Sequence, residues 1–119
     1  MAKVFVVDDD AIVRSIVVQF LQFDGHTTIQ FATGQELIDH LASEAPDLVI
    51  TDLSMPVMSG LDLREILREI SPSVPCVVMT GHLMDEGIRS RFDAVLEKPL
   101  GCREMLDVVK TLVSEQVPA

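Results

Sequence analysis

The sequence predicts an α/β fold: a doubly wound, five-stranded parallel sheet in the order 2-1-3-4-5, with helices on both faces. Five short apolar runs of strand character alternate along the 119-residue chain with segments whose apolar residues recur every three or four positions. Consecutive strand–helix units joined by right-handed crossovers build a parallel sheet. In the expected order the ends of strands 1, 3, 4 and 5 lie together, so polar residues at those ends would share one site.

The first expected strand is Lys3–Val7, a valine-rich run that stops at three consecutive aspartates. A helix is expected over Ala11–Phe23, with Asp10 as its N-cap and Gly25 just beyond its end. The apolar residues of this helix recur at steps of four in two adjacent series, which predicts one broad buried face. The two series are Ile12, Ile16 and Phe20, and Val13, Val17 and Leu21.

The next segments continue the alternation. Thr27–Phe31 has the composition of a short second strand. Thr33 and Glu36 have the spacing of a capping box, and they open a helix that ends before Pro46. Leu48–Thr51 is the third strand, and it is apolar enough to be buried on both faces of a sheet.

The second half of the chain is expected to supply the strands Pro75–Thr80 and Ala94–Glu97 and the helices Leu61–Ile70 and Cys102–Val113. Residues 81–97 must therefore hold a loop, a helix, a second loop and the fifth strand. With connections of ~2–6 residues and a strand of ~5, two helical turns remain at most. We expect the fourth helix to be short, irregular or mobile.

Composition restricts the class of protein. The length suits a single domain over residues 1–119, with residues 114–119 as a frayed end or the start of a linker. The net charge of −10 argues against direct binding to nucleic acid or to an anionic membrane. No apolar run approaches the ~20 residues that span a bilayer, and the first residues lack the features of a signal peptide. Both cysteines are expected to be reduced, as in a cytoplasmic protein.

Polar residues occupy the carboxyl ends of four expected strands. Asp8 and Asp9 follow the first strand, Asp52 follows the third, Thr80 ends the fourth and Lys98 follows the fifth. Neighbouring carboxylates repel one another unless a cation lies among them, and oxygen ligands with positions left for water suit Mg²⁺. An ammonium and a hydroxyl can hold phosphoryl oxygens, and a carboxylate can attack phosphorus to form an acyl phosphate. Asp52, at the centre of the group, is the candidate nucleophile.

The motifs that carry these residues resemble the receiver domain of two-component response regulators, the family of the single-domain chemotaxis response regulator. The motifs are Val6-Val7-Asp8-Asp9-Asp10 with Arg14, Asp52-Leu53-Ser54-Met55-Pro56 with Gly60, Val77-Val78-Met79-Thr80-Gly81, and Leu96-Glu97-Lys98-Pro99. The resemblance extends from residue 3 to about residue 113. It implies a phosphoacceptor switch that is not an enzyme acting on a separate substrate.

The resemblance also implies the role of each metal ligand. Asp52 would accept a phosphoryl group from a phosphohistidine on a sensor kinase or a histidine phosphotransfer protein. Mg²⁺ would be held by Asp9, Asp52 and the backbone carbonyl of Ser54, with Asp8 acting through water. Phosphorylation would change the affinity for a downstream protein target or an effector domain.

The resemblance likewise assigns the phosphate contacts. Lys98 would contact the phosphoryl group from a cis Lys98–Pro99 peptide, and Thr80 would move to the phosphate and carry the signal. Arg14 would have a structural or helix-surface role. The positions of His82 and Ser54 influence the lifetime of the phosphate in this family. His82 would either border the phosphate or be an exposed loop histidine.

Two features depart from the family pattern. The family usually has Tyr or Phe three residues before the lysine, where this chain has Val95, and a valine has no ring to move together with Thr80. The short segment between Thr80 and Lys98 leaves little room for the fourth helix. Because partners of the family usually bind the face formed by helix 4, strand 5 and helix 5, this chain is expected to use another surface.

Three other functions fit parts of the sequence. An aspartate-nucleophile phosphatase of the haloacid dehalogenase type requires a second Asp where this chain has Ser54. An FMN-binding protein requires a loop rich in Gly, Ser and Thr after the first strand, where three aspartates would repel the phosphate. A receiver-like interaction module that is never phosphorylated is the remaining alternative, and Val95 is the residue that keeps it open.

Overall fold

The computed structural model of the protein describes residues 2–81 and 84–116. Its strands form one parallel sheet in the order β2-β1-β3-β4-β5, as the sequence predicts. The strands are β1 (Lys3–Val7), β2 (Thr27–Phe31), β3 (Leu48–Asp52), β4 (Cys76–Thr80) and β5 (Ala94–Glu97). In residues 2–81 and 84–116, no helix is both long enough and apolar enough to cross a bilayer.

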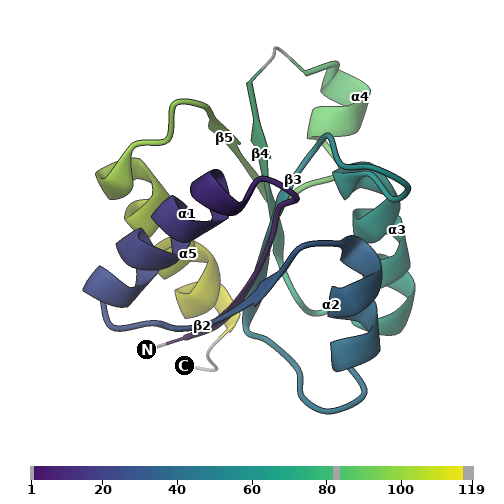
Figure 1. The fold of residues 1–119 in the computed structure, drawn as a ribbon, viewed down its shortest axis with the longest axis horizontal. Coiled ribbons are helices and arrows are strands. Elements are labelled where there is room, and N and C mark those ends of the chain that lie inside the picture. The colour runs from purple at the N-terminus through teal and green to yellow at the C-terminus, as the bar shows by residue number, and fades with distance from the viewer. Residues whose placement is uncertain (1, 82–83, 117–119) are drawn as a thin grey trace.

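Helices cover both faces of the sheet. Helices α1 and α5 lie on one face, and α2, α3 and the short α4 lie on the other (Figure 1). Their bounds are α1 (Ala11–Phe23), α2 (Gly34–His40), α3 (Gly60–Ile70), α4 (Glu86–Arg89) and α5 (Cys102–Gln116). Wherever the sequence predicts both ends of an element, the predicted bounds agree to within one residue, except that α5 extends three residues further.

Each face of the sheet has its own hydrophobic core. Because successive strand residues point to opposite faces, Val6 and Ile50 pack toward α1 and α5, whereas Val7 and Val49 pack toward α2 and α3. All residues of β3 and β4 are buried, as expected for central strands covered on both faces. These buried strands give rigid support to the polar residues at their carboxyl ends.

Helix α1 buries a narrower face than the sequence predicts. Val17, Val18 and Leu21 are buried, whereas Ile12 is 74% exposed and Ile16 is 41% exposed. The prediction of one broad face that includes both isoleucines is therefore wrong. A helix lying on a sheet buries a stripe of roughly 100° of its circumference, and in α1 this stripe is centred on Val17 and Leu21.

The helix caps also differ from the prediction. At α2 the Thr33 side chain accepts the N–H of Glu36 at 3.1 Å, but the Glu36 carboxylate accepts the N–H of Ala32 rather than that of Thr33. The predicted capping box is thus half formed. The reciprocal pair is found at α3, where Ser59 and Asp62 each accept the other's backbone N–H at 3.1 Å.

Helix α4 has four residues, which confirms the short fourth helix expected from the sequence. A buried arginine of α3 anchors the connection from α4 to β5. The Arg64 guanidinium donates to the carbonyls of Arg91 at 2.8 Å and Val74 at 3.4 Å and to the Asp93 carboxylate at 3.0 Å. The same Asp93 oxygen accepts the N–H of Cys76, the first residue of β4, at 2.7 Å. A polar network therefore ties α3 to the connection between α4 and β5.

We expect Arg64→Met to lower the free energy of unfolding by roughly 2–3 kcal/mol, because Met keeps the apolar stem but leaves buried acceptors unpaired. Asp93 is about one-third exposed, and solvent screening limits the loss. Arg68 is the matched control, since it also donates to the Arg91 carbonyl, at 3.0 Å, but is exposed. Urea unfolding should show a loss under about 1 kcal/mol for Arg68→Met. Equal losses in the two variants would contradict the anchoring role of Arg64.

Candidate functional site

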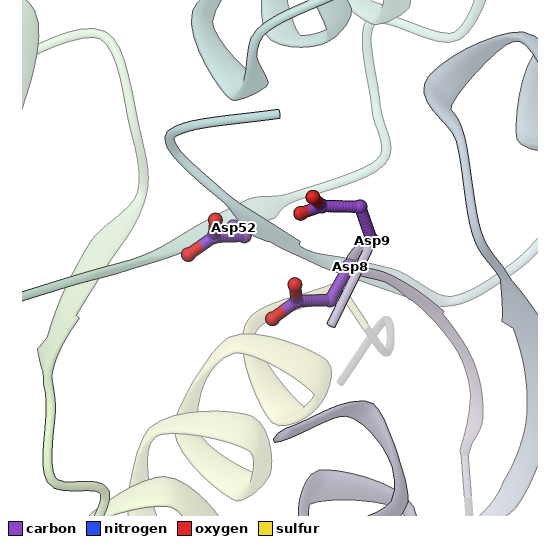
Figure 2. A group of neighbouring side chains, drawn as sticks. All are labelled: Asp8, Asp9 and Asp52. Carbon is purple, nitrogen blue, oxygen red and sulfur yellow. The ribbon is translucent and has the colours of Figure 1, made fainter. Parts of the chain in front are cut away.

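Three carboxylates meet at the carboxyl edge of the sheet. Strands β1 and β3 are paired in register, so Asp8 and Asp9, which follow β1, lie beside Asp52, which ends β3. Figure 2 shows the three side chains projecting to the same side of these strand ends. One oxygen from each carboxylate lies within 4.8 Å of the other two. The structure thus brings together the three acids that sequence reasoning places in one site.

Asp52 also contacts the predicted cation. The residue is 7% exposed, and its Oδ1 accepts a hydrogen bond from the Lys98 ammonium at 2.8 Å. Burial lowers the pKa of Lys98. The hydrogen bond to Asp52 and the negative charges of Asp52 and Asp8 raise it by more than burial lowers it, so the pKa lies above its ordinary value. Lys98 therefore remains a cation. Thr80, the last residue of β4, is buried at the same edge.

Asp8 is fully buried and incompletely hydrogen-bonded. Its Oδ1 accepts the N–H of Asp10 at 2.9 Å, whereas Oδ2, 3.9 Å from the Lys98 ammonium, has no hydrogen-bond partner among the described residues. Burial raises the pKa of Asp8 to about 6; the hydrogen bond from Asp10 lowers it and the charge of Asp52 raises it. This buried oxygen lacks a hydrogen bond and lies beside two other carboxylates. A hard cation, or a water molecule bound to it, would complete such a site.

Arg14 has the structural role expected from the sequence. Its guanidinium extends from α1 and donates to the backbone carbonyl of Asp8 at 2.6 Å and to the Gln30 side chain at 3.3 Å. This contact fixes the turn between β1 and α1, and with it the position of the buried carboxylate.

The loop after Asp52 is sharply bent. The Met58 N–H donates to the Pro56 carbonyl at 2.7 Å, and the intervening Val57 has a φ of 68°, a strained conformation for a β-branched residue. At Gly60 a Cβ atom would lie 2.3 Å from the Asp52 carbonyl oxygen, so the loop can return to the strand end here because the residue is glycine. The motif pattern includes Gly60, but it contains no signal for the strained turn at Val57.

Ser54, Val95 and the Lys98–Pro99 peptide were also singled out from the sequence, and the structure describes all three. Ser54 is exposed in the loop two residues beyond Asp52. Val95 is half-buried opposite Val78 of β4, so an aliphatic side chain packs in the place of the usual aromatic. The Lys98–Pro99 peptide bond is cis, as the resemblance implies. His82 lies outside the described residues.

Residues 4–110 match the family model of the response regulator receiver domain. The chain belongs to this family. This receiver domain is 34% identical over 116 residues to the DNA-binding transcriptional regulator NtrC of Escherichia coli K12. The matched region covers 93% of this chain and 24% of that protein. The receiver domain is 32% identical over 120 residues to the response regulator MprA of Mycolicibacterium vanbaalenii, with 98% and 52% covered. The chain thus spans about a quarter to a half of these relatives.

Solved structures agree with the family match. A CheY-like receiver domain protein from Methanospirillum hungatei superposes with a TM-score of 0.90 at 27% identity, covering 98% of this chain and 96% of that one. The predicted fold class and the predicted place in two-component signalling are therefore confirmed. Receiver domains generally bind Mg²⁺, and the clustered carboxylates of this receiver domain are ligands of the kind that Mg²⁺ prefers.

We expect Asp8→Asn to stabilise the metal-free receiver domain near neutral pH, because Asn removes a buried charge and keeps an oxygen for the Asp10 N–H. Folding raises the pKa of Asp8 from 3.8 to about 6, so the ionised carboxylate destabilises the folded state above pH 6. This destabilisation disappears as the pH falls from 6 toward 4. Urea unfolding in a chelator should show a gain of roughly 1–3 kcal/mol at pH ~7.5 and a much smaller gain at pH ~4.5.

Asp9→Asn is the matched control for this measurement. Asp9 belongs to the same cluster but is exposed, so its replacement removes an equal charge without relieving burial. A smaller gain is therefore expected for Asp9→Asn. A loss of stability in Asp8→Asn near neutral pH, or a gain that does not change with pH, would contradict the electrostatic origin assigned to Asp8.

Proposed function

We propose that this receiver domain accepts a phosphoryl group on Asp52 in a Mg²⁺-dependent phosphorelay and thereby switches its affinity for a protein partner. The observation that carries the proposal is the position of Asp52. Its carboxylate bonds the Lys98 ammonium at 2.8 Å, and it shares a 4.8 Å cluster with Asp8 and Asp9. The nucleophile thus lies between a cation for a phosphoryl oxygen and an acidic pair for a metal ion. Phosphoryl transfer depends mainly on such positioning and charge neutralisation.

Four residues would hold the metal ion. Asp9, Asp52 and the backbone carbonyl of Ser54 would bind Mg²⁺ directly, and Asp8 would act through a bound water. The unpaired Oδ2 of Asp8 supports this assignment, because a metal-bound water can donate the hydrogen bond that this oxygen lacks. The bound ion would neutralise negative charge on the incoming phosphoryl oxygens.

The phosphodonor is a phosphohistidine on a sensor kinase or a histidine phosphotransfer protein. A carboxylate oxygen of Asp52 attacks phosphorus, the P–N bond breaks with its electron pair remaining on the imidazole, and an acyl phosphate forms. Lys98 then pairs with one phosphoryl oxygen, and the Thr80 hydroxyl donates to another. Attack of water on phosphorus regenerates the carboxylate and releases inorganic phosphate. The domain thus assists its own phosphorylation and hydrolysis and is not an enzyme for a separate substrate.

Phosphorylation shifts the population between two states of the domain. The phosphoryl group adds charge that one arrangement of Thr80 and Lys98 satisfies better than the other. Val95 has no ring to move, so Thr80 carries the change. Residues 1–119 act as one cytoplasmic domain whose output is a downstream protein or an effector domain. The net charge of −10 supports protein partners over direct contact with nucleic acid or a membrane.

Incubation with acetyl phosphate and Mg²⁺ should add one phosphoryl group to the wild-type chain, measured as intact mass. The modification should be stable in acid and labile in base, as an acyl phosphate is, and chelation of Mg²⁺ should prevent it. Asp52→Asn should take up no phosphoryl group, because the nucleophilic carboxylate is gone.

Asp39→Asn is the control for charge removal, since Asp39 is exposed on α2, away from the cluster. This variant should be labelled like the wild type. An unchanged wild-type mass, under conditions that preserve acyl phosphates, would refute the proposal in favour of an interaction module that works without phosphorylation. Equal labelling of Asp52→Asn would place the phosphoacceptor elsewhere.

A further inference from the structure

Asp9 has the least support of the three clustered acids. The backbone N–H of Asp8 donates to the Phe31 carbonyl at 3.2 Å. The Asp52 carboxylate accepts a hydrogen bond from the Lys98 ammonium at 2.8 Å. Asp9 is exposed, and in the described part of the chain no hydrogen bond or ion pair involves its backbone or its carboxylate. The Asp9 carboxylate therefore takes its position from the backbone on either side of it.

The side chain of Arg14 restrains the peptide unit that leads into Asp9. The Asp8 carbonyl and the Asp9 N–H belong to this one planar unit. The Arg14 guanidinium donates to the Asp8 carbonyl at 2.6 Å through Nη1 and to the Gln30 side-chain oxygen at 3.3 Å through Nε. Gln30 is paired in register with Val6, whose side chain packs toward α1, so Gln30 lies on the same face of the sheet. A guanidinium is planar and its donors point in fixed directions, so two contacts orient it.

The charge of Arg14 is bonded to neutral groups. Among the residues that the structure describes, Arg14 makes no ion pair, although three consecutive aspartates directly precede α1. Its partners are a backbone carbonyl and a side-chain amide. Hydrogen bonds from a charged donor are shorter and stronger than those between neutral groups, and the 2.6 Å contact to the Asp8 carbonyl is short. Arg14 therefore fixes the geometry of the backbone and does not neutralise a carboxylate by direct contact.

We propose that Arg14, braced by Gln30, is a positioning residue for the metal site. By holding the Asp8 carbonyl, it directs the Asp9 carboxylate toward the other two acids of the cluster, where Mg²⁺ would bind. The inference rests on the proposed function, in which Asp9 is a direct metal ligand. Residues that orient a metal ligand without touching the ion typically change the metal affinity 10- to 100-fold, and Arg14 is assigned this role.

Position and charge give Arg14 opposite effects on metal binding. A positive charge beside a cation site repels the incoming ion, so loss of the guanidinium charge alone would strengthen Mg²⁺ binding. Loss of the hydrogen bond to the Asp8 carbonyl leaves Asp9 to be ordered when the metal binds, and that ordering costs binding free energy. The sign of the change in affinity therefore separates a positioning role from a purely electrostatic one.

Titration with Mg²⁺, followed by amide chemical shifts, measures the dissociation constant in each variant. Arg14→Met keeps the apolar stem but has no donor, and we expect its dissociation constant to rise about tenfold. Arg14→Lys keeps the charge but lacks the planar fork that reaches both acceptors, so an intermediate rise is expected.

Lys110→Met is the matched control, because it removes the same charge. Lys110 is exposed, makes no ion pair among the described residues, and lies about 12 Å along α5 from the first residue of that helix. Solvent and salt screen a charge at this separation, so the dissociation constant should stay within about twofold of the wild type.

Backbone ¹⁵N relaxation of the metal-free chain gives a second readout, which a general loss of stability would not reproduce. The order parameter of the Asp9 amide should fall in Arg14→Met, whereas those of β1 should stay as in the wild type. If Arg14→Met does not fold, Gln30→Leu removes only the brace of the guanidinium and leaves the net charge unchanged. This variant should also bind Mg²⁺ more weakly than the wild type, and an unchanged dissociation constant would overturn the proposal.

The outcomes distinguish this inference from the proposed function. Equal or tighter Mg²⁺ binding by Arg14→Met, with clear binding by the wild type, would overturn the positioning role and leave the phosphoacceptor proposal in place. Equal weakening in Arg14→Met and Lys110→Met would overturn it too. A wild-type chain that binds no Mg²⁺ would overturn the metal site of the proposed function and this inference with it.

Discussion

Electrostatic crowding at one edge of the sheet is the constraint on which the site depends. The parallel register holds Asp8, Asp9 and Asp52 together, and Lys98 supplies an ammonium to Asp52 at 2.8 Å. One oxygen of Asp8 is buried without a hydrogen-bond partner among the described residues, and the Lys98 ammonium lies 3.9 Å from it. Three carboxylates thus share this ammonium, and negative charge remains in excess at this edge. Such a site favours a divalent cation and, with it, a phosphoryl group. The acidic cluster thus lowers the stability of the metal-free fold, and it does so at the site of the proposed chemistry.

Contacts on both faces of the sheet hold this edge in place. Gly60 allows the loop after β3 to return against the Asp52 carbonyl, and Arg64 anchors the chain between the short α4 and β5. On the opposite face, Arg14 links α1 to the backbone of Asp8. Helix α1 is therefore attached directly to the backbone of the acidic cluster.

The sequence predicts the fold and the carboxylate cluster because both follow from local pattern and parallel topology. Apolar runs identify the strands, and the strand order then brings Asp8, Asp9 and Asp52 to one edge. Periodicity identifies a helix but does not determine how it is rotated on the sheet, so it predicts the wrong side of the helix for Ile12 and Ile16. Residue spacing cannot predict contacts between distant segments, such as that of Arg64 with the loop before β5. It also cannot predict the strained φ of Val57.

The central claim is that the Asp52 carboxylate itself becomes the acyl phosphate. Borohydride reduces an acyl phosphate to an alcohol and does not reduce a free carboxylate, so it marks the modified residue permanently. After treatment with acetyl phosphate and Mg²⁺, followed by borohydride and proteolysis, peptide mass spectrometry should find homoserine at position 52 and unmodified aspartate at positions 8 and 9. Homoserine at position 8 or 9, or unreduced Asp52 in a chain that carries phosphate, would contradict the account.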